Sequence, residues 1–201
     1  MKHLLFLIVC GCSSFILMAQ DQKDIAAREG LAKFKQLLLV QPQRDKPAID
    51  TTNLTLGPSV PVAVVSLDKL KQYKAGEAAE GLISDIDEVI FPVLDGRSKA
   101  VTSTLTIGRV KDRWMVTRFG ADKDALQEAA ATISQQNRAY KLVKIQAFHL
   151  SFLSYSEAGN MLFIPLQDDQ EKEIVRGRAA SAGAILEKYV KPANDYNGLP
   201  M

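Results

Sequence analysis

The stretch that decides the fold is Asp87–Gly120, DEVIFPVLDGRSKAVTSTLTIGRVKDRWMVTRFG, in which three runs of alternating apolar and polar residues are separated by turn signals. Alternation with a period of two is the pattern of a strand that buries one face, and Asp95-Gly96 is typical of a tight hairpin. The stretch therefore predicts a meander of three consecutive antiparallel strands. In the middle strand, we expect the threonines between Val101 and Ile107 on a solvent-exposed face.

Three segments outside this meander place apolar residues at helical spacing, which predicts a helix for each. The first runs from residue 22 to 40, the second follows Gly120 and ends near Asn137, and the third covers Gln170 to Val190, where Pro192 would stop it. Strands come in runs instead of alternating with helices. The prediction is an α+β fold, with an antiparallel or mixed sheet of about five to six strands packed by three main helices.

The longest strand-like run, Tyr140 to Tyr155, changes the phase of its apolar residues near Ala147. Such a change predicts a bulge, or a strand that leaves one core and enters another. Because both phases are apolar, we expect a partner or ligand to cover any face that the chain itself leaves open. The candidate binding residues are large apolar side chains of this run and the single tryptophan: Phe148, Leu150, Phe152 and Trp114.

The first nineteen residues show the pattern of a secretory signal peptide, because Lys2 and His3 precede an apolar run that closes at the small residue Ala19. Cys12 offers an alternative. It follows a glycine and has an aliphatic residue three positions before it, which loosely fits a lipoprotein box and predicts lipidation. The expected location is periplasmic or secreted, with a lipid anchor in the envelope as the alternative.

Cleavage after Ala19 leaves residues 20–201, a length suited to a single domain. Within it, the prolines and polar residues of 41–59 predict an irregular loop, and the polar segment 193–201 predicts a frayed tail. The whole chain carries 25 Lys and Arg against 23 Asp and Glu, a formal net charge of +2. This balance gives no reason to expect nucleic acid as a partner, and it leaves the lipid anchor as the expected route to a membrane.

Beyond residue 19 the chain has no cysteine and one histidine, His149. This composition excludes thiol nucleophiles, thiolate zinc sites and three-histidine metal cages there, and no cofactor is expected. His149 stands between Phe148 and Leu150 in an apolar run, which favours a structural role. Asp85, Asp87 and Glu88 form the best local group of acids. They could hold calcium or serve a carboxylate-dependent hydrolase, but the favoured interpretation is a solvated strand entrance whose charges discourage edge pairing.

The sequence thus favours an exported, non-catalytic binding or accessory domain whose ligand, a protein, a glycan or a small molecule, it does not identify. The first alternative is a carboxylate-dependent hydrolase or calcium-dependent enzyme. The second is an envelope assembly or interaction protein, for which the small residues from Gly177 to Leu186 would provide a helix surface suited to a homodimer.

Overall fold

A computed structural model gives the fold of the chain. It describes residues 4–40, 49–120, 123, 126–127 and 139–198, with side chains from residue 21 onward.

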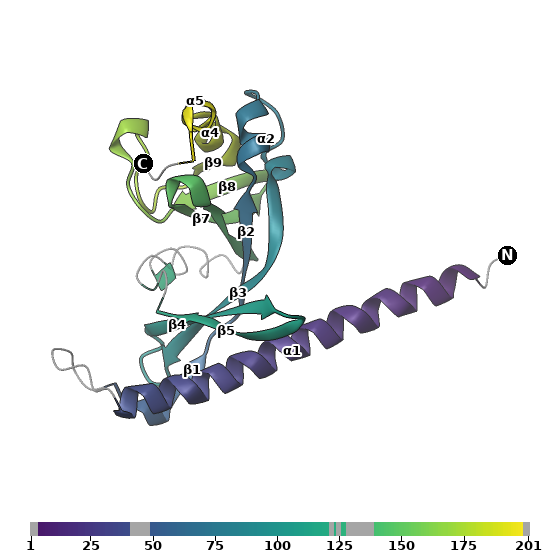
Figure 1. The fold of residues 1–201 in the computed structure, drawn as a ribbon, viewed down its shortest axis with the longest axis vertical. Helices are drawn as coiled ribbons and strands as arrows, with labels where there is room; N and C mark the ends of the chain where they lie inside the picture. Colours follow the sequence, from purple (N-terminus) through teal and green to yellow (C-terminus); the bar gives the residue numbers. More distant parts are fainter. Residues whose placement is uncertain (1–3, 41–48, 121–122, 124–125, 128–138, 199–201) are drawn as a thin grey trace. The chain divides into compact units, whose positions relative to one another are not determined.

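Contacts between residues divide the chain into two compact units, whose elements are labelled in Figure 1. Unit 1 comprises residues 1–58 and 91–121, and unit 2 comprises residues 59–90 and 122–201. One long strand, β3 (Ile83–Asp95), contributes residues to both units. The prediction of a single domain therefore stays open.

Unit 1 is a helix packed against an antiparallel meander. Its elements are α1 (Leu4–Val40), the 3-10 turn η1 (Thr51–Asn53), β1 (Leu54–Leu56), the end of β3, β4 (Val101–Val110) and β5 (Arg113–Phe119). The predicted three-strand meander is confirmed, because β3, β4 and β5 follow one another along the chain and are neighbours in the sheet.

The first turn of the meander, between β3 and β4, differs from the tight hairpin expected at Asp95-Gly96. The carboxylate of Asp95 accepts hydrogen bonds from the backbone N–H groups of Arg97 and Ser98, at 2.9 and 2.8 Å, and the positive φ falls on Lys99, at 59°. Gly96 is required for another reason, since a Cβ there would lie 2.5 Å from the carbonyl oxygen of Asn53.

The predicted wet threonine face of β4 is wrong. Thr104 and Thr106 are fully buried, as are Leu105 and Ile107 on the opposite face. Alternation indicated a half-buried strand, but β4 lies between β3 and β5 and is covered on both sides. Burial of a hydroxyl normally requires a hydrogen-bond partner. Thr106 Oγ1 has none among the described residues.

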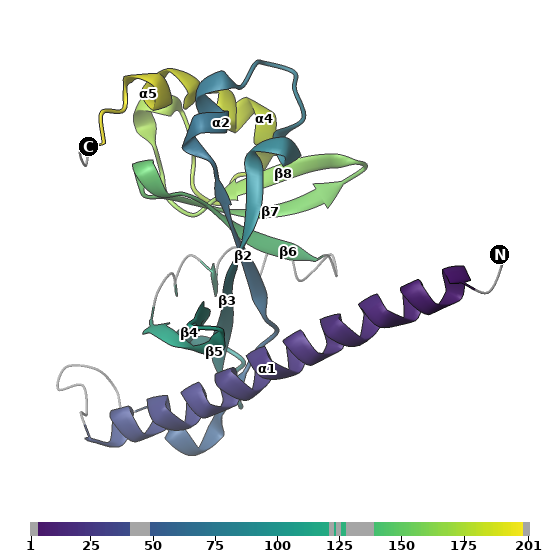
Figure 2. The ribbon, with the colours of Figure 1, turned by 45° about the vertical axis from the view of Figure 1, so that its right-hand side comes forward.

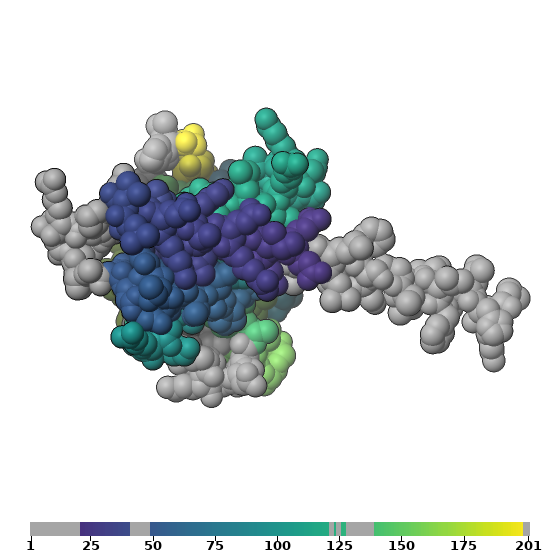
Figure 3. Space-filling model, turned by 90° about the horizontal axis from the view of Figure 1, so that it is seen from below, coloured from purple at the N-terminus to yellow at the C-terminus, as the bar shows by residue number. Residues whose placement is uncertain are grey.

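Helix α1 contains the predicted helix at 22–40, which is confirmed, and it packs on β4 and β5. Gly30 marks a close approach of the helix to β5, because an added Cβ would overlap with Cγ2 of Val116. The rings of Phe34 and Phe119 stack with their centroids 5.8 Å apart. Figure 3 shows the outer surface of residues 21–40, with residues of the meander beside it.

The helix continues without a break from the apolar N-terminal run into the packed part, past Ala19. Cleavage at that residue stays a prediction, as does lipidation of Cys12. Within the described part of the chain, no helix offers a stretch long and apolar enough to cross a membrane.

Unit 2 combines strands with short helices on one sheet face (Figure 2). Its elements are β2 (Val60–Val65), α2 (Leu67–Gln72), η2 (Ala79–Leu82), the start of β3, β6 (Tyr140–Ile145), η3 (Gln146–Phe148), β7 (Leu150–Glu157), β8 (Asn160–Pro165), η4 (Gln170–Lys172), β9 (Ala180–Ser181), α4 (Ala182–Glu187) and α5 (Val190–Asp195).

The strands form a mixed nine-strand sheet in the order β5-β4-β3-β2-β6-β7-β8-β9, with β1 paired to β3. Its described pairs are antiparallel except for β2 with β6, where Val62 lies opposite Leu142. The α+β class and the mixed sheet are confirmed, whereas the expected five to six strands are too few. One reason is that the Tyr140–Tyr155 run is a hairpin of two strands, so the phase change near Ala147 is a turn and not a bulge.

Both faces of the sheet in unit 2 are buried, as the two apolar phases of the run suggested. One face, which includes Val143 and Phe152, packs against α2, α4 and α5. The other includes Leu142 and Leu153, and its cluster contains Leu126. Neither phase is left as an open apolar face, because these sheet residues are almost completely shielded from solvent.

The prediction of three main helices is wrong, since one helix of seven or more residues, α1, occurs among the described residues. The third predicted helix, 170–190, is replaced by η4, an irregular segment, β9 and α4. Glu173 and Gly177 have positive φ angles of 51° and 75°, which no right-handed helix accommodates. Apart from residues 123 and 126–127, which are helical, the predicted helix after Gly120 lies outside the described residues.

Pro192 does not stop a helix, because it lies in the first turn of α5, where a missing N–H costs no intrahelical bond. Ala193, at the start of the expected frayed tail, is fully buried, and Asn194 Nδ2 donates to the carbonyl of Lys71 at 3.2 Å.

Candidate functional site

The candidate site lies in unit 2, where the turn between β6 and β7, the 3-10 turn η4 and the helix α5 converge. An inner pocket of about 160 Å³ opens there. It is lined by Ala147, Phe148, His149, Leu150, Asp169, Glu171, Lys172, Tyr189 and Pro192. Beside it runs a charged groove of about 630 Å³, which shares Glu171, Lys172 and Pro192 with the inner pocket.

The turn that forms one wall depends on the backbone of His149. The 3-10 turn η3 ends at this residue, which adopts the left-handed conformation with φ 53° and ψ 29°. The chain can then reverse directly, so that Ile145 pairs with Leu150. The carbonyl of His149 accepts a hydrogen bond from Gln167 Nε2 at 2.6 Å. Because the left-handed conformation is costly for a residue with a Cβ, this turn stores strain beside the pocket.

Aromatic rings form another wall of the inner pocket. The rings of Phe148 and Tyr189 stack with centroids 5.6 Å apart, and Tyr196 meets Phe148 edge to face at 6.0 Å. Tyr189 is buried, whereas Phe148 is partly exposed toward the pocket. Such rings offer a large, rigid apolar surface to any group that enters.

The hydroxyl of Tyr189 is fixed by Asp169. It donates a hydrogen bond to Asp169 Oδ2 at 2.7 Å, while Oδ1 of the same carboxylate accepts from the backbone N–H of Lys172 at 3.2 Å. Burial raises the pKa of the Tyr189 phenol, and the Asp169 carboxylate raises that pKa further. Tyr189 therefore stays protonated near neutral pH, and its hydrogen bond fixes the position of Asp169.

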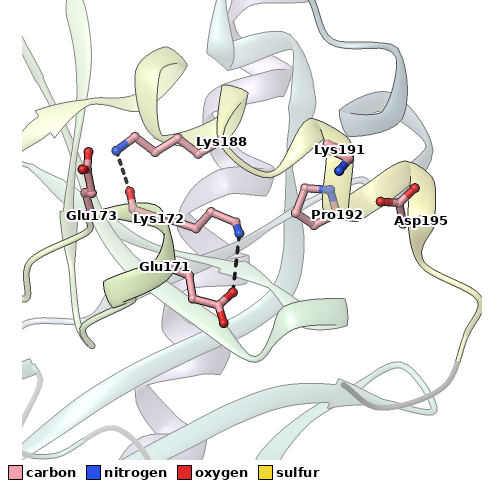
Figure 4. A pocket seen from close by; sticks show the side chains of 7 residues that line it. All are labelled: Glu171, Lys172, Glu173, Lys188, Lys191, Pro192 and Asp195. Atoms are coloured by element: carbon pink, nitrogen blue, oxygen red, sulfur yellow. Dashed lines mark hydrogen bonds and ion pairs between the residues drawn. The ribbon is translucent and has the colours of Figure 1, made fainter.

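The charged groove carries equal numbers of positive and negative side chains (Figure 4). These are Lys172, Lys188 and Lys191 against Glu171, Glu173 and Asp195. Lys188 Nζ donates to the carbonyl oxygen of Lys172 at 2.5 Å, and Lys172 Nζ lies 3.8 Å from Glu171 Oε2. A contact between η4 and Lys188, the residue that follows α4, thus helps to build the groove, which presents charges of both signs to a ligand.

A second hollow of unit 2, about 470 Å³ in volume, is lined by three glutamates, Glu77, Glu80 and Glu187. The Tyr73 hydroxyl, which also lines it, donates to the carbonyl oxygen of Glu77 at 2.9 Å. No group of three or more His, Cys, Asp and Glu side chains that could hold a metal ion occurs among the described residues, and these glutamates are included in that finding.

The structure separates the four predicted binding residues. Phe148 and Leu150 line the inner pocket, Leu150 as a buried residue. Phe152 lies in the core, its ring stacked on Phe163 with centroids 5.0 Å apart. Trp114 belongs to unit 1, where Lys23 Nζ stands 4.6 Å from the centroid of its ring.

The three predicted acids lie on β3 where its register against β2 shifts. Asp85 Oδ1 accepts a hydrogen bond from Lys141 Nζ at 2.7 Å. Neither Asp85, Asp87 nor Glu88 lines the inner pocket, the charged groove or the glutamate hollow. The calcium and hydrolase hypotheses accordingly gain no support from the geometry of these acids.

Sequence reasoning missed Asp169 and Tyr189, the central pair of the site. They are twenty residues apart and meet because the intervening segment folds back, with Asp169 bridged to Ile174. Comparisons of the chain with protein-family models, with curated proteins and with solved structures found no match.

Proposed function

We propose that this protein is an exported, non-catalytic binding or accessory domain, and that it holds a small ligand with one apolar ring in the inner pocket of unit 2. The observation that carries the proposal is the size and lining of that pocket. A buried apolar cavity of about 150 Å³ accommodates a benzene ring. The inner pocket, at about 160 Å³ and with Phe148 and Tyr189 in its wall, suits one ring of that size.

The polar groups around the pocket support binding over catalysis. Tyr189 and Asp169 are bonded to each other, and Asp169 also caps η4 through Lys172. These contacts fix the shape of the pocket and leave neither group poised to transfer a proton. The charged groove then receives the polar part of the ligand, since charges at its rim can pair with a carboxylate, an ammonium or both.

Binding is tested with ring-bearing fragments whose charge differs: toluene, phenylacetate, phenethylamine and phenylalanine. At about 0.3–0.5 kcal/mol per non-hydrogen atom, such fragments bind with Kd between about 0.04 and about 30 mM, which backbone amide shifts in NMR spectra can follow. We expect the shifts to concentrate at residues 146–150 and 169–172. The preferred head group would identify the charge that the groove recognises.

The site is tested further by a variant that fills the inner pocket and by a matched control variant. Ala147→Leu places extra methyl groups in the inner pocket, whereas Ala75→Leu makes the same change at an exposed residue that lines none of the pockets described here. We expect the first variant to abolish the fragment shifts and the second to leave them unchanged. Equal responses of the two variants, or no shifts at 146–150 with any fragment, would refute the proposed site.

Export is tested separately by the intact mass of the protein recovered from cells. Loss of residues 1–19 would show cleavage after Ala19, and a chain that starts at Cys12 with added lipid mass would show the lipoprotein alternative. Recovery of the unprocessed chain in the cytoplasmic fraction would refute export without affecting the ligand site.

A further inference from the structure

Among the described residues, strand β5 is the terminal strand of the sheet order and forms a sheet edge in unit 1. Five of its seven residues are exposed. They include Met115, which is 47 % exposed, and Phe119, which is 40 % exposed. An edge strand presents unpaired backbone groups, so a long edge with exposed apolar side chains is a template for an added strand.

The two faces of this edge differ in character. The register of β5 against β4 shifts between Thr106 and Ile107, which places Thr117 in a bulge. Trp114 and Val116, before the bulge, therefore share the α1 side with Phe119, after it; the contacts with Lys23, Gly30 and Phe34 confirm this. By register Arg113, Met115 and Arg118 lie on the other side, and Arg113, at the start of the strand, also lines the pocket beside Trp114.

A pocket lies beside the first residues of this strand, on the side that faces α1. The Trp114 pocket, about 260 Å³ in volume, is lined by Gln22, Ile25, Ala26, Glu29, Asp112, Arg113 and Trp114. Ile25 is 55 % exposed. Peptides that add a strand to a sheet gain affinity from backbone hydrogen bonds and specificity from pockets for alternate side chains. An edge and a pocket of this kind occur together here.

The charge of the β4–β5 hairpin indicates which kind of strand could pair with the β5 edge. It carries four basic side chains, Arg109, Lys111, Arg113 and Arg118, against one acid, Asp112, which pairs with Arg109 at 3.0 Å. A second copy of this edge would bring like charges together, which opposes pairing. An acidic strand would instead meet complementary charge.

We infer that β5 is a docking edge for an extended, acidic segment of a partner protein, which adds to unit 1 as a further strand. An acidic side chain in one phase of the segment lies near Arg113. An apolar side chain in the other phase enters the Trp114 pocket. This inference is independent of the ligand site proposed in unit 2.

The test uses the full-length chain and a set of eight-residue peptides in which glutamate alternates with valine and one apolar position is varied among valine, isoleucine, leucine and phenylalanine. Fluorescence of the single tryptophan, Trp114, reports binding, because the peptide would cover its pocket. A copy of the best peptide with methyl groups on alternate backbone nitrogens keeps the charges but cannot form strand hydrogen bonds.

We expect at least one peptide to bind with Kd below 1 mM (about −4 kcal/mol) and the methylated copy to bind at least tenfold more weakly. Arg113→Glu should weaken binding about tenfold. Lys99→Glu makes the same charge change in the exposed turn between β3 and β4, and it should have little effect.

Three results would overturn the inference. In the first, no peptide of the set binds below 1 mM. In the second, the methylated copy binds as well as its parent, which would show attraction between charges without strand addition. In the third, sedimentation shows a dimer of the chain that Arg113→Glu dissociates, which would identify a second copy as the occupant of the edge.

Discussion

Replacing Gly30 by alanine sets two effects of opposite sign against each other. Alanine favours a helix over glycine by about 1 kcal/mol, so the change would stabilise an exposed helical position. At Gly30, however, the added Cβ would overlap with Cγ2 of Val116 and would stand 3.4 Å from Cδ1 of Leu105. The sign of the effect therefore depends on whether the contact between α1 and β5 can widen.

The structure indicates that it widens only at a cost. Val116 is β-branched and stiff at χ1, so its methyl group cannot swing aside freely. Moving α1 outward would separate the stacked rings of Phe34 and Phe119. Overpacking of this kind costs about 1–3 kcal/mol, and the overlap is severe enough to place the cost in the upper half of that range. After the gain in helix propensity of about 1 kcal/mol is subtracted, Gly30→Ala should lower the free energy of unfolding by about 1–2 kcal/mol.

Urea unfolding followed by Trp114 fluorescence measures this difference in unit 1, where that residue lies. Ala32→Gly, at an exposed position of the same helix, isolates the propensity effect and should cost about 1 kcal/mol. Shortening Val116 to alanine restores space, so the double variant Gly30→Ala, Val116→Ala should lose less than the sum of its single changes. A gain in stability from Gly30→Ala alone, or strict additivity in the double variant, would refute the close approach.

Three further outcomes follow from individual contacts. The backbone N–H groups of Ser98 and Arg97 hold the pKa of Asp95 below its usual value, so its contribution is present above about pH 4 and disappears as the pH falls through the lowered pKa; Asp95→Asn should flatten the fall of the urea midpoint between about pH 5 and pH 2. Because the pKa of Tyr189 is raised in the fold, its protonated phenol contributes stability that is fully present below about pH 10 and declines at higher pH. The phenolate absorbance that Tyr189→Phe removes should therefore appear only as the chain unfolds. At His149, with φ 53°, glycine should preserve or raise the thermal midpoint while valine lowers it, the valine costing about 1–2 kcal/mol; equal midpoints for the two variants would show that the turn is unstrained.

The elements that could be predicted from the sequence are those with local causes. The meander follows from alternation over short runs that end at turns, and the strands from Ile83 to Phe119 depend on these signals. The packed part of α1 follows from apolar residues at helical spacing. Such patterns act within one element, so a single sequence reveals them.

The errors arose where tertiary packing or a single backbone angle decides. Thr104 and Thr106 are buried by what surrounds β4, which alternation along that strand does not encode. The segment 170–190 has helical apolar spacing, but its buried residues Ile174 and Leu186 serve one core from separate elements. His149 converts a strand-like run into a hairpin without glycine or proline as a signal.

The site was harder to predict than the fold because its central contact is not local. Phe148 and Leu150 were expected to bind a ligand through an open sheet face, and they line a pocket at the end of the sheet instead. Asp169 precedes η4 and caps it by accepting a hydrogen bond from the backbone N–H of Lys172. Nothing in its neighbourhood along the chain points to the Tyr189 hydroxyl.

Along the chain, the β4–β5 hairpin lies between the two segments of unit 2, and this arrangement affects the order in which the units can fold during synthesis. All residues of unit 1 have left the ribosome once residue 121 has, whereas β2 needs β6, which lies beyond the hairpin. Pairing across such a separation is slow, and unpaired apolar strands are prone to aggregate. Pulse-labelled hydrogen exchange should therefore protect residues 101–119 before residues 140–165. In the interval, β2 can pair with β3 but has no strand on its other edge, and that apolar edge is what a chaperone would need to shield.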